Sequence, residues 1–172
     1  MKNPGREIES EMKNWFEDRG YFSVVTVLNG VAIGLLEEMS EEDIIRFSED
    51  FEGDLEYKGI LEGAGGYKRG AKKRNVVSEG PEIHHYSFSH PLVEKYKCCL
   101  EEWFDNQGFD CDYWLFSGYI SIYSHDTLAD DQIASFEKEF EVKYDENWEN
   151  CPEINHYFFD VKDEVLKNQR IL

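Results

Sequence analysis

The order of aromatic and glycine residues in the first half of the chain recurs in the second half. Four of these residues have counterparts 88 positions later, pairing Trp15 with Trp103, Phe16 with Phe104, Gly20 with Gly108 and Gly30 with Gly118. Near the ends of the two halves, PEIHHYSF at 81–88 resembles PEINHYFF at 152–159. Agreement of these residue types in one order indicates an internal duplication, with residues 1–90 as the first copy and 91–172 as the second.

Each copy begins with a predicted helix and a predicted hairpin. Apolar residues recur at helical spacing in 8–16 and again in 96–104, and both helices are expected to end at a glycine. An Asn-Gly pair and a Ser-Gly pair then separate short apolar runs, and such pairs favour hairpin turns. The runs are 21–28 with 31–36 in copy one, and 113–116 with 119–123 in copy two.

A second helix and two strands complete each copy. Ser40 and Thr127 are of the residue type that caps helix N-termini, and each stands three positions before an acidic residue. We therefore expect second helices near 40–52 and 128–142. Strands are expected at 54–61 and 82–89 in copy one and at 143–148 and 154–161 in copy two, with a short helix near 162–169.

These elements predict an α+β fold built from an internally duplicated αββαββ repeat. Helices with one apolar stripe and strands that alternate favour antiparallel sheet with helices packed on one face. The copies are expected to be related by a pseudo-two-fold axis, either in one continuous sheet or in two. No flexible linker separates Ser89, His90 and Pro91, so we expect the copies to pack as one compact body.

Acidic residues outnumber basic ones, 37 Asp and Glu against 18 Lys and Arg, and the formal net charge is −19. Such a chain repels nucleic acid and anionic lipid, so we expect a basic protein partner, with no direct binding to nucleic acid or membrane. No apolar run is long enough to cross a bilayer, and the first residues lack an apolar signal segment. These features predict a cytoplasmic protein.

The carboxylates concentrate in the predicted second helices and beside them. In copy one the candidate partner-binding residues are Glu37, Glu38, Glu41, Glu42, Asp43, Glu49, Asp50 and Glu52. In copy two they are Asp130, Asp131, Glu137, Glu139, Glu141, Asp145, Glu146 and Glu149. Carboxylates three or four residues apart on a helix lie roughly 5 to 6 Å apart, close to the phosphate spacing of a nucleic-acid strand. This predicts a surface that imitates nucleic acid, and an ordinary solvated helix face is the alternative.

A glycine-rich basic loop at 62–80 has no counterpart in copy two. Its cationic residues are Lys68, Arg69, Lys72, Lys73 and Arg74. Ala71 separates Gly70 from Lys72, and no Ser or Thr follows that lysine, which excludes a Walker-type phosphate loop. We interpret the loop as an exposed hairpin tip. The alternative is a basic arm that touches nucleic acid or an acidic patch.

Catalytic and metal-binding motifs are absent from the sequence. No GxSxG, HExxH, GxGxxG or EF-hand pattern occurs, and the equivalent histidines His85 and His156 have no third ligand at a defined spacing. The four cysteines match no CxxC or zinc-ligand pattern and are expected to be reduced and mostly buried. We therefore expect no catalytic residue, no metal and no cofactor.

Aromatic residues stand among the charged ones at Tyr57, Tyr67, Tyr144 and Trp148. Acidic groups interleaved with aromatic ones suit a protein partner rich in arginine, and core filling is the alternative.

The sequence thus predicts a non-enzymatic acidic inhibitor that mimics nucleic acid and blocks the basic groove of a DNA- or RNA-handling enzyme. Anti-restriction or anti-CRISPR proteins of phages and plasmids are one setting, with action in the host cytoplasm. Immunity proteins that neutralise nuclease toxins are another. Two alternatives stay open: a non-catalytic adaptor module that binds a ligand or peptide, and a small enzyme using His85, His156 and neighbouring carboxylates.

Overall fold

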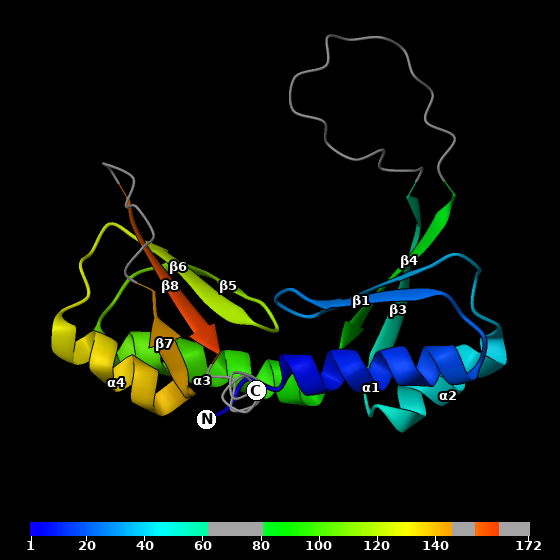
Figure 1. Cartoon of the computed structure of the whole chain (residues 1–172), viewed down its shortest axis with the longest axis horizontal. Coiled ribbons are helices and arrows are strands. Elements are labelled where there is room, and N and C mark those ends of the chain that lie inside the picture. The colour runs from blue at the N-terminus through cyan, green and yellow to red at the C-terminus, as the bar shows by residue number, and fades with distance from the viewer. Residues whose placement is uncertain (62–80, 146–153, 162–172) are drawn as a thin grey trace, which may run out of the picture. The chain divides into compact units, whose positions relative to one another are not determined.

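The structure, a computed structural model, describes residues 1–61, 81–145 and 154–161 (Figure 1). The first half contains α1 (Gly5–Asp18), β1 (Ser23–Val27), β2 (Val31–Leu35), α2 (Glu41–Asp50), β3 (Asp54–Leu61) and β4 (Ile83–Ser89). The second half contains α3 (Pro91–Gln107), β5 (Asp112–Leu115), β6 (Tyr119–Ser124), α4 (Asp130–Phe140), β7 (Val142–Tyr144) and β8 (Asn155–Val161). The predicted succession of elements is confirmed in both halves, and the helix expected near 162–169 lies outside the described residues.

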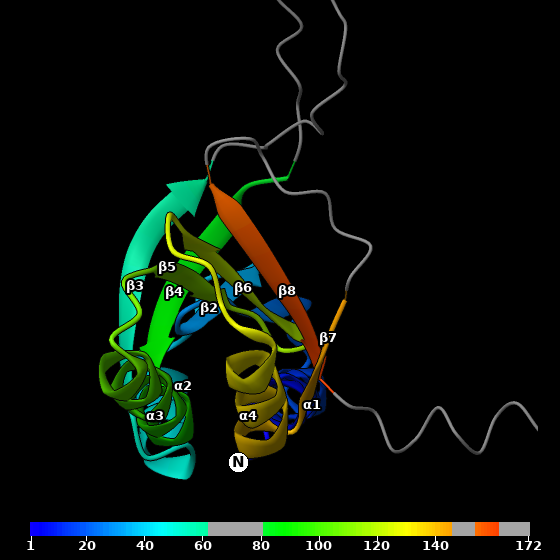
Figure 2. The ribbon, with the colours of Figure 1, turned by 90° about the vertical axis from the view of Figure 1, so that its left-hand side faces the viewer.

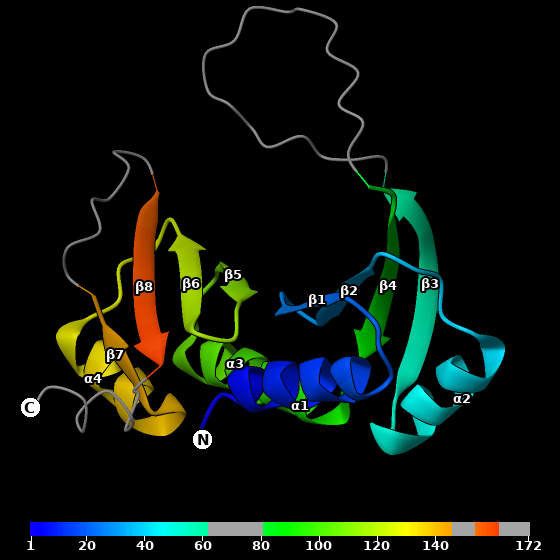
Figure 3. The same cartoon turned by 45° about the vertical axis from the view of Figure 1, so that its right-hand side comes forward.

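The strands form two four-stranded antiparallel sheets, which confirms the predicted α+β class. We call them sheet A, with strand order β1-β2-β4-β3, and sheet B, with order β5-β6-β8-β7. In sheet B, β8 runs alongside β6 (Figure 2). In sheet A, β3 and β4 form a long curved pair (Figure 3). Of the two arrangements left open by the sequence, the described strands therefore adopt two sheets.

Contacts within the chain define two compact units, one around each sheet. The sheet A unit comprises Ser10–Thr26 and Gly30–His90. The sheet B unit comprises Met1–Glu9, Val27–Asn29 and the residues from Pro91 onward. The start of α1 and the turn of the β1–β2 hairpin thus belong with the second half of the sequence. Packing of the two copies as one compact body stays a prediction.

Helices α1 and α3 end in the same way, at a glycine. Gly20 and Gly108 have positive φ angles of +81° and +62°. In each case the next residue donates its N–H, at 3.0 Å, to the carbonyl five positions back, linking Tyr21 to Phe16 and Phe109 to Phe104. Glycine adopts a positive φ without a Cβ clash, so these residues stop the helices as the sequence predicts.

The predicted N-terminal caps are right for one second helix and wrong for the other. Ser40 caps α2, and its Oγ accepts a hydrogen bond from the Asp43 N–H at 3.1 Å. Helix α4 begins later than expected, and its N-cap is Ala129 rather than Thr127. The Ala129 N–H donates to Gln132 Oε1 at 3.0 Å. The side chain at the third helical position therefore satisfies the N–H of the N-cap residue, and this helix begins without a capping hydroxyl.

Aromatic rings fill the space between helices and sheet in each unit. In the sheet A unit, the Phe47 ring of α2 lies 5.0 Å from Trp15, 5.1 Å from Phe16 and 5.1 Å from Phe88. In the sheet B unit, the Phe136 ring of α4 lies 4.9 Å from Trp103, 5.9 Å from Phe104 and 4.5 Å from Phe159. The helices therefore pack on the face of sheet A that carries Phe88 and on the face of sheet B that carries Phe159. None of the described helices is both long and apolar enough to span a bilayer.

Candidate functional site

The carboxylates predicted in copy one lie on α2 and beside it. Exposed members before and along the helix are Glu37, Glu38, Glu41, Glu42, Glu49 and Asp50. Glu52 follows the helix, is exposed and has a left-handed backbone with φ +52°. Between the two ends of α2, the exposed positions carry Ile45 and Arg46. The helix thus presents carboxylates at both ends and not in one continuous row.

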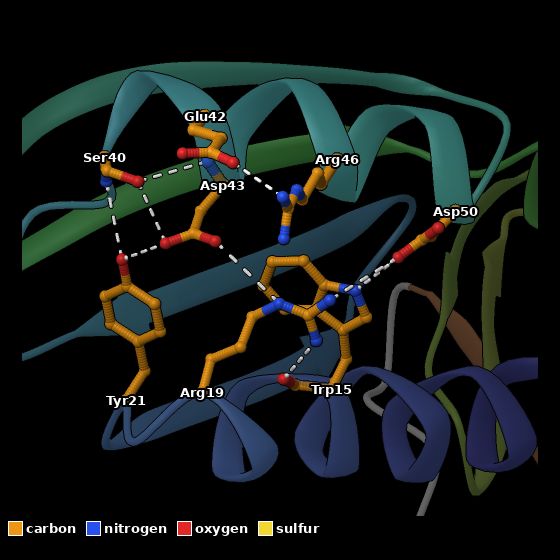
Figure 4. Close-up of polar contacts among 8 residues, drawn as sticks. All are labelled: Trp15, Arg19, Tyr21, Ser40, Glu42, Asp43, Arg46 and Asp50. Atoms are coloured by element: carbon orange, nitrogen blue, oxygen red, sulfur yellow. Dashed lines mark hydrogen bonds and ion pairs between the residues drawn. The ribbon is translucent and has the colours of Figure 1, made fainter.

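Asp43 serves the local structure rather than an open surface (Figure 4). Its Oδ2 accepts hydrogen bonds from Tyr21 Oη at 2.8 Å and from Ser40 Oγ at 2.9 Å. Burial raises the pKa of Tyr21, and the hydrogen bond to Asp43 raises it further, so the phenol stays a donor. These bonds fix the start of α2 against the segment that follows α1.

Asp50 joins the other end of α2 to α1 (Figure 4). Its Oδ2 accepts a hydrogen bond from Trp15 Nε1 at 2.7 Å. The Arg19 guanidinium lies 3.7 Å from the centre of the Trp15 ring and 3.8 Å from Asp50. Glu42 pairs with Arg46 at 2.6 Å. Glu42, Asp43 and Asp50 therefore all have partners within the chain.

The carboxylates predicted in copy two are more scattered. Asp130 and Asp131 are exposed in the first turn of α4, where negative charge favours the helix through its dipole. The other exposed positions of this helix carry Ala134, Ser135, Lys138 and Glu139. Among its exposed positions, helix α4 therefore carries acidic residues in its first turn and at Glu139, while Glu137 is half-buried.

Three further acids of copy two contact the chain itself. Glu137 Oε1 accepts a hydrogen bond from the Tyr144 N–H at 2.8 Å. Glu141 Oε1 lies 3.7 Å from the N-terminal ammonium, which also donates to the Glu139 carbonyl. Asp145 is half-buried. The predicted residues Glu146, Glu149, Lys68, Arg69, Lys72, Lys73 and Arg74 lie outside the described part of the chain.

The equivalent histidines lie in different units. His85 is on β4 of sheet A, opposite Gly34. His156 is on β8 of sheet B, and its Nε2 lies 2.6 Å from Ser121 Oγ. Across residues 1–61, 81–145 and 154–161, no group of three or more His, Cys, Asp or Glu side chains is arranged to hold a metal ion.

The outer face of sheet B, opposite the face that packs on α4, has Ser121 at its centre. Trp114 and Phe158 lie directly across from Ser121 on the neighbouring strands, and Tyr119 and Tyr123 lie two residues away along β6. Because Ser121 is small and its neighbours are large, a pocket of about 530 Å³ opens above it. Leu28, Phe116 and His156 complete the lining. We call this the aromatic pocket.

The rings of the aromatic pocket stack on one another, with one exception. The ring centroids of Phe116 and Tyr119 are 4.2 Å apart, and those of Tyr119 and Phe158 are 4.5 Å apart. Tyr123 stacks on His156 at 4.3 Å. Trp114 takes part in none of the ring pairs found in the described chain, and its side chain is 46% exposed. The indole is therefore the ring most available to a ligand.

The floor of the aromatic pocket is polar, and two carboxylates lie outside its lining on the same face of the sheet. Burial lowers the pKa of His156, so its imidazole is neutral near pH 7 and bonds to Ser121 without adding positive charge. Asp112 and Asp160 are the register partners of Tyr123 and Tyr119 and share their face of the sheet. Burial and the Asp145 carboxylate raise the pKa of Asp160, while Arg6 opposes the shift.

A turn of the chain covers the edge of β5 beside the pocket. The Asn29 N–H donates to the Leu115 carbonyl at 2.9 Å, and the Leu115 N–H donates to Asn29 Oδ1 at 2.7 Å. These bonds satisfy edge-strand groups that would otherwise be open to pairing with another chain. They also bring Leu28 beside Phe116, where it lines the pocket.

The aromatic residues singled out from the sequence do not form this site. Tyr57 is on β3 of sheet A, with its hydroxyl 3.2 Å from His84 Nδ1, and Tyr144 is half-buried. Tyr67 and Trp148 lie outside the described residues. The available signal was the alternation in YISIYS at 119–124, which places Tyr119, Ser121 and Tyr123 on one face.

The described cysteines are free thiols, but the prediction that they are mostly buried is wrong. Cys98 is exposed, and Cys99 and Cys111 are half-buried. Cys98 points outward because α3 buries its apolar stripe elsewhere, at Tyr96 and Leu100. Cys151 lies outside the described residues.

Alkylation should therefore distinguish the thiols. Burial, together with the nearby carboxylates of Asp110 and Asp112, raises the pKa of Cys111 to about 12. At pH 8 its reactive thiolate is then only on the order of one part in 10⁴. Iodoacetamide labelling followed by peptide mass spectrometry should modify the exposed Cys98 at least tenfold faster than Cys111, and urea should equalise the two rates. Equal rates in the native protein would contradict the described burial.

No protein family model, curated protein or solved structure matches the chain. The class is therefore defined by the fold and the candidate site alone: an α+β protein with two four-stranded antiparallel sheets, an acidic surface and an aromatic pocket.

Proposed function

We propose that the protein is an acidic inhibitor that mimics nucleic acid and blocks the basic groove of a DNA- or RNA-handling enzyme. The net charge of −19 carries this proposal, because complementary charge speeds association with a basic partner. Eight of the predicted carboxylates support it, since they are exposed and make none of the side-chain hydrogen bonds or ion pairs found among the described residues. These are Glu37, Glu38, Glu41, Glu49, Glu52, Asp130, Asp131 and Glu139.

We further propose that the two halves are copies of one αββαββ ancestor. Equivalent details support this. The residues after α2 and α4 that adopt positive φ are Glu52 and Glu141, at +52° and +54°. In each half a strand tyrosine, Tyr86 or Tyr157, accepts a hydrogen bond from a loop N–H at 2.9 Å. A pseudo-two-fold relation between the copies stays a prediction.

Neutralising the free carboxylates should slow association with the partner. The test variant is Glu41→Gln, Glu49→Gln, Asp130→Asn and Asp131→Asn, which removes charge without placing lysine against a helix N-terminus. Basic proteins retained from a nuclease-rich lysate at 50 mM NaCl and released at 500 mM provide the partner. Surface plasmon resonance at 50 mM NaCl should show an on-rate about tenfold lower than for the wild type.

The matched control removes four exposed acids from α1 and α3, through Glu17→Gln, Asp18→Asn, Glu102→Gln and Asp105→Asn. Both variants have the same net charge, so a difference between them reports position and not total charge. The control should keep at least half of the wild-type on-rate. Equal losses in the two variants, or no loss in either, would count against an inhibitor that uses the carboxylates of α2 and α4.

The aromatic pocket favours a second candidate, a non-catalytic module that binds a ligand or peptide. Its volume of about 530 Å³ and its mainly aromatic lining are typical of small-molecule sites. Apolar binding of this kind survives 500 mM NaCl, whereas charge-driven binding weakens. The salt dependence of partner binding therefore separates the two candidates.

A further inference from the structure

We propose that the aromatic pocket of sheet B receives an arginine side chain of the basic partner. This inference rests on the proposed function, because the expectation of a basic partner is what selects a cationic occupant. It adds a specific contact to a proposal that otherwise depends on long-range charge.

The shape of the pocket suits a planar group. Ser121 is 4% exposed at the floor, and the large side chains around it form walls. Trp114 stands at the side with 46% of its surface exposed and no ring stacked on it among the described residues. A guanidinium is planar and weakly hydrated, and it stacks on the face of an indole more readily than an ammonium does.

The charge around the pocket also favours a cation. No described residue of the lining is a lysine or arginine, and the neutral imidazole of His156 adds no positive charge. Asp112 is exposed on the same face of β5 as Trp114, two residues and thus about 7 Å along the strand. Asp160 lies at the opposite corner of this face. Its negative charge is offset by Arg6 and by Lys143, which is the register partner of Asp160 on β7. Asp112 is therefore the carboxylate positioned to pair with a guanidinium stacked on Trp114.

Other occupants leave part of the site unexplained. A nucleotide would bring phosphate charge to a chain of net charge −19. A neutral apolar ligand would leave Asp112 without a role and would gain nothing from the acidic surface. The arginine side chain uses both the indole and the carboxylate.

Isothermal titration of the full chain with nona-arginine and nona-lysine tests the inference, because the two peptides have equal charge and differ in stacking. At 50 mM NaCl, nona-arginine should bind about fivefold more tightly than nona-lysine. Trp114→Ala should reduce this preference to less than twofold, and Asp112→Asn should reduce it partly. Phe22→Ala is the matched control, since Phe22 is a 78% exposed aromatic residue of the sheet A unit, and it should leave the preference unchanged.

Four results would overturn the inference. If both peptides bind equally, or if the preference persists in Trp114→Ala, the pocket does not select arginine, while salt-dependent binding leaves the proposed function in place. If N-acetyl-tryptophanamide binds in a Trp114-dependent way and nona-arginine shows no preference, the pocket is an apolar ligand site. If neither peptide binds at 50 mM NaCl, both the inference and the proposed function fail.

Discussion

The Phe47→Ala substitution is expected to lower the free energy of unfolding by about 3 to 5 kcal/mol. Phe47 is fully buried, and its ring contacts Trp15 and Phe16 of α1 and Phe88 of β4. Removing the Phe47 ring leaves a cavity where two helices and the sheet meet. The surrounding rings are each held by several neighbours, so they cannot move to fill this cavity. Urea unfolding followed by tryptophan fluorescence measures the loss, since Trp15 lies 5.0 Å from Phe47.

Two further variants keep this result interpretable. Phe136→Ala removes the corresponding ring of the sheet B unit and should cost a similar amount. Phe22→Ala removes a 78% exposed ring and should change stability by less than about 0.5 kcal/mol. If Phe47→Ala fails to fold, Phe47→Leu should still fold with a smaller loss. A Phe47→Ala protein within about 1 kcal/mol of the wild type would contradict the described core.

The Tyr86→Phe substitution is expected to cost about 1 to 3 kcal/mol although it removes one atom. Tyr86 is 1% exposed, and its Oη accepts a hydrogen bond from the buried N–H of Met39 at 2.9 Å. Phenylalanine leaves that N–H without an acceptor, and burial prevents water from replacing it. Urea unfolding of the purified variant gives the change in free energy.

Tyr157→Phe provides the matching experiment in the sheet B unit, because its hydroxyl accepts from the Leu128 N–H at the same distance. Tyr57→Phe is the control, since Tyr57 is 42% exposed and water can replace its hydrogen bond to His84. The two buried tyrosines should cost similar amounts and Tyr57 much less. Equal and small effects at all three positions would show that the buried hydroxyls are dispensable.

Most of the fold could be predicted from the sequence, because local signals and the repeat agree. Glycines at 20 and 108 stop two helices, and the apolar spacing that predicts α1 and α3 is the spacing that the cores use. The prediction of a Thr127 cap was wrong because Gln132 holds the start of α4 by accepting a hydrogen bond from the Ala129 N–H, so the helix begins without a capping hydroxyl. Sheet number stayed open, since strand pairing between distant segments leaves no local signal.

The candidate site was harder to predict than the fold. The aromatic pocket combines Trp114, Ser121 and Phe158 from three strands, and their juxtaposition depends on strand register. Leu28 joins them through a turn that pairs with β5, which no sequence pattern indicates. Similarly, the sequence gives Asp43 and Asp50 the same weight as Glu41. Only the structure distinguishes carboxylates with internal donors from those without.

An acidic protein that takes the place of nucleic acid on a basic partner, as we propose, competes with DNA for that partner. Fluorescence anisotropy of a labelled DNA duplex bound to the partner captured at low salt measures this competition. Adding the protein at 50 mM NaCl should release the DNA at about one equivalent, and the variant with Glu41, Glu49, Asp130 and Asp131 neutralised should need about tenfold more. A rise in anisotropy, with protein and DNA bound to the partner together, would contradict this proposal.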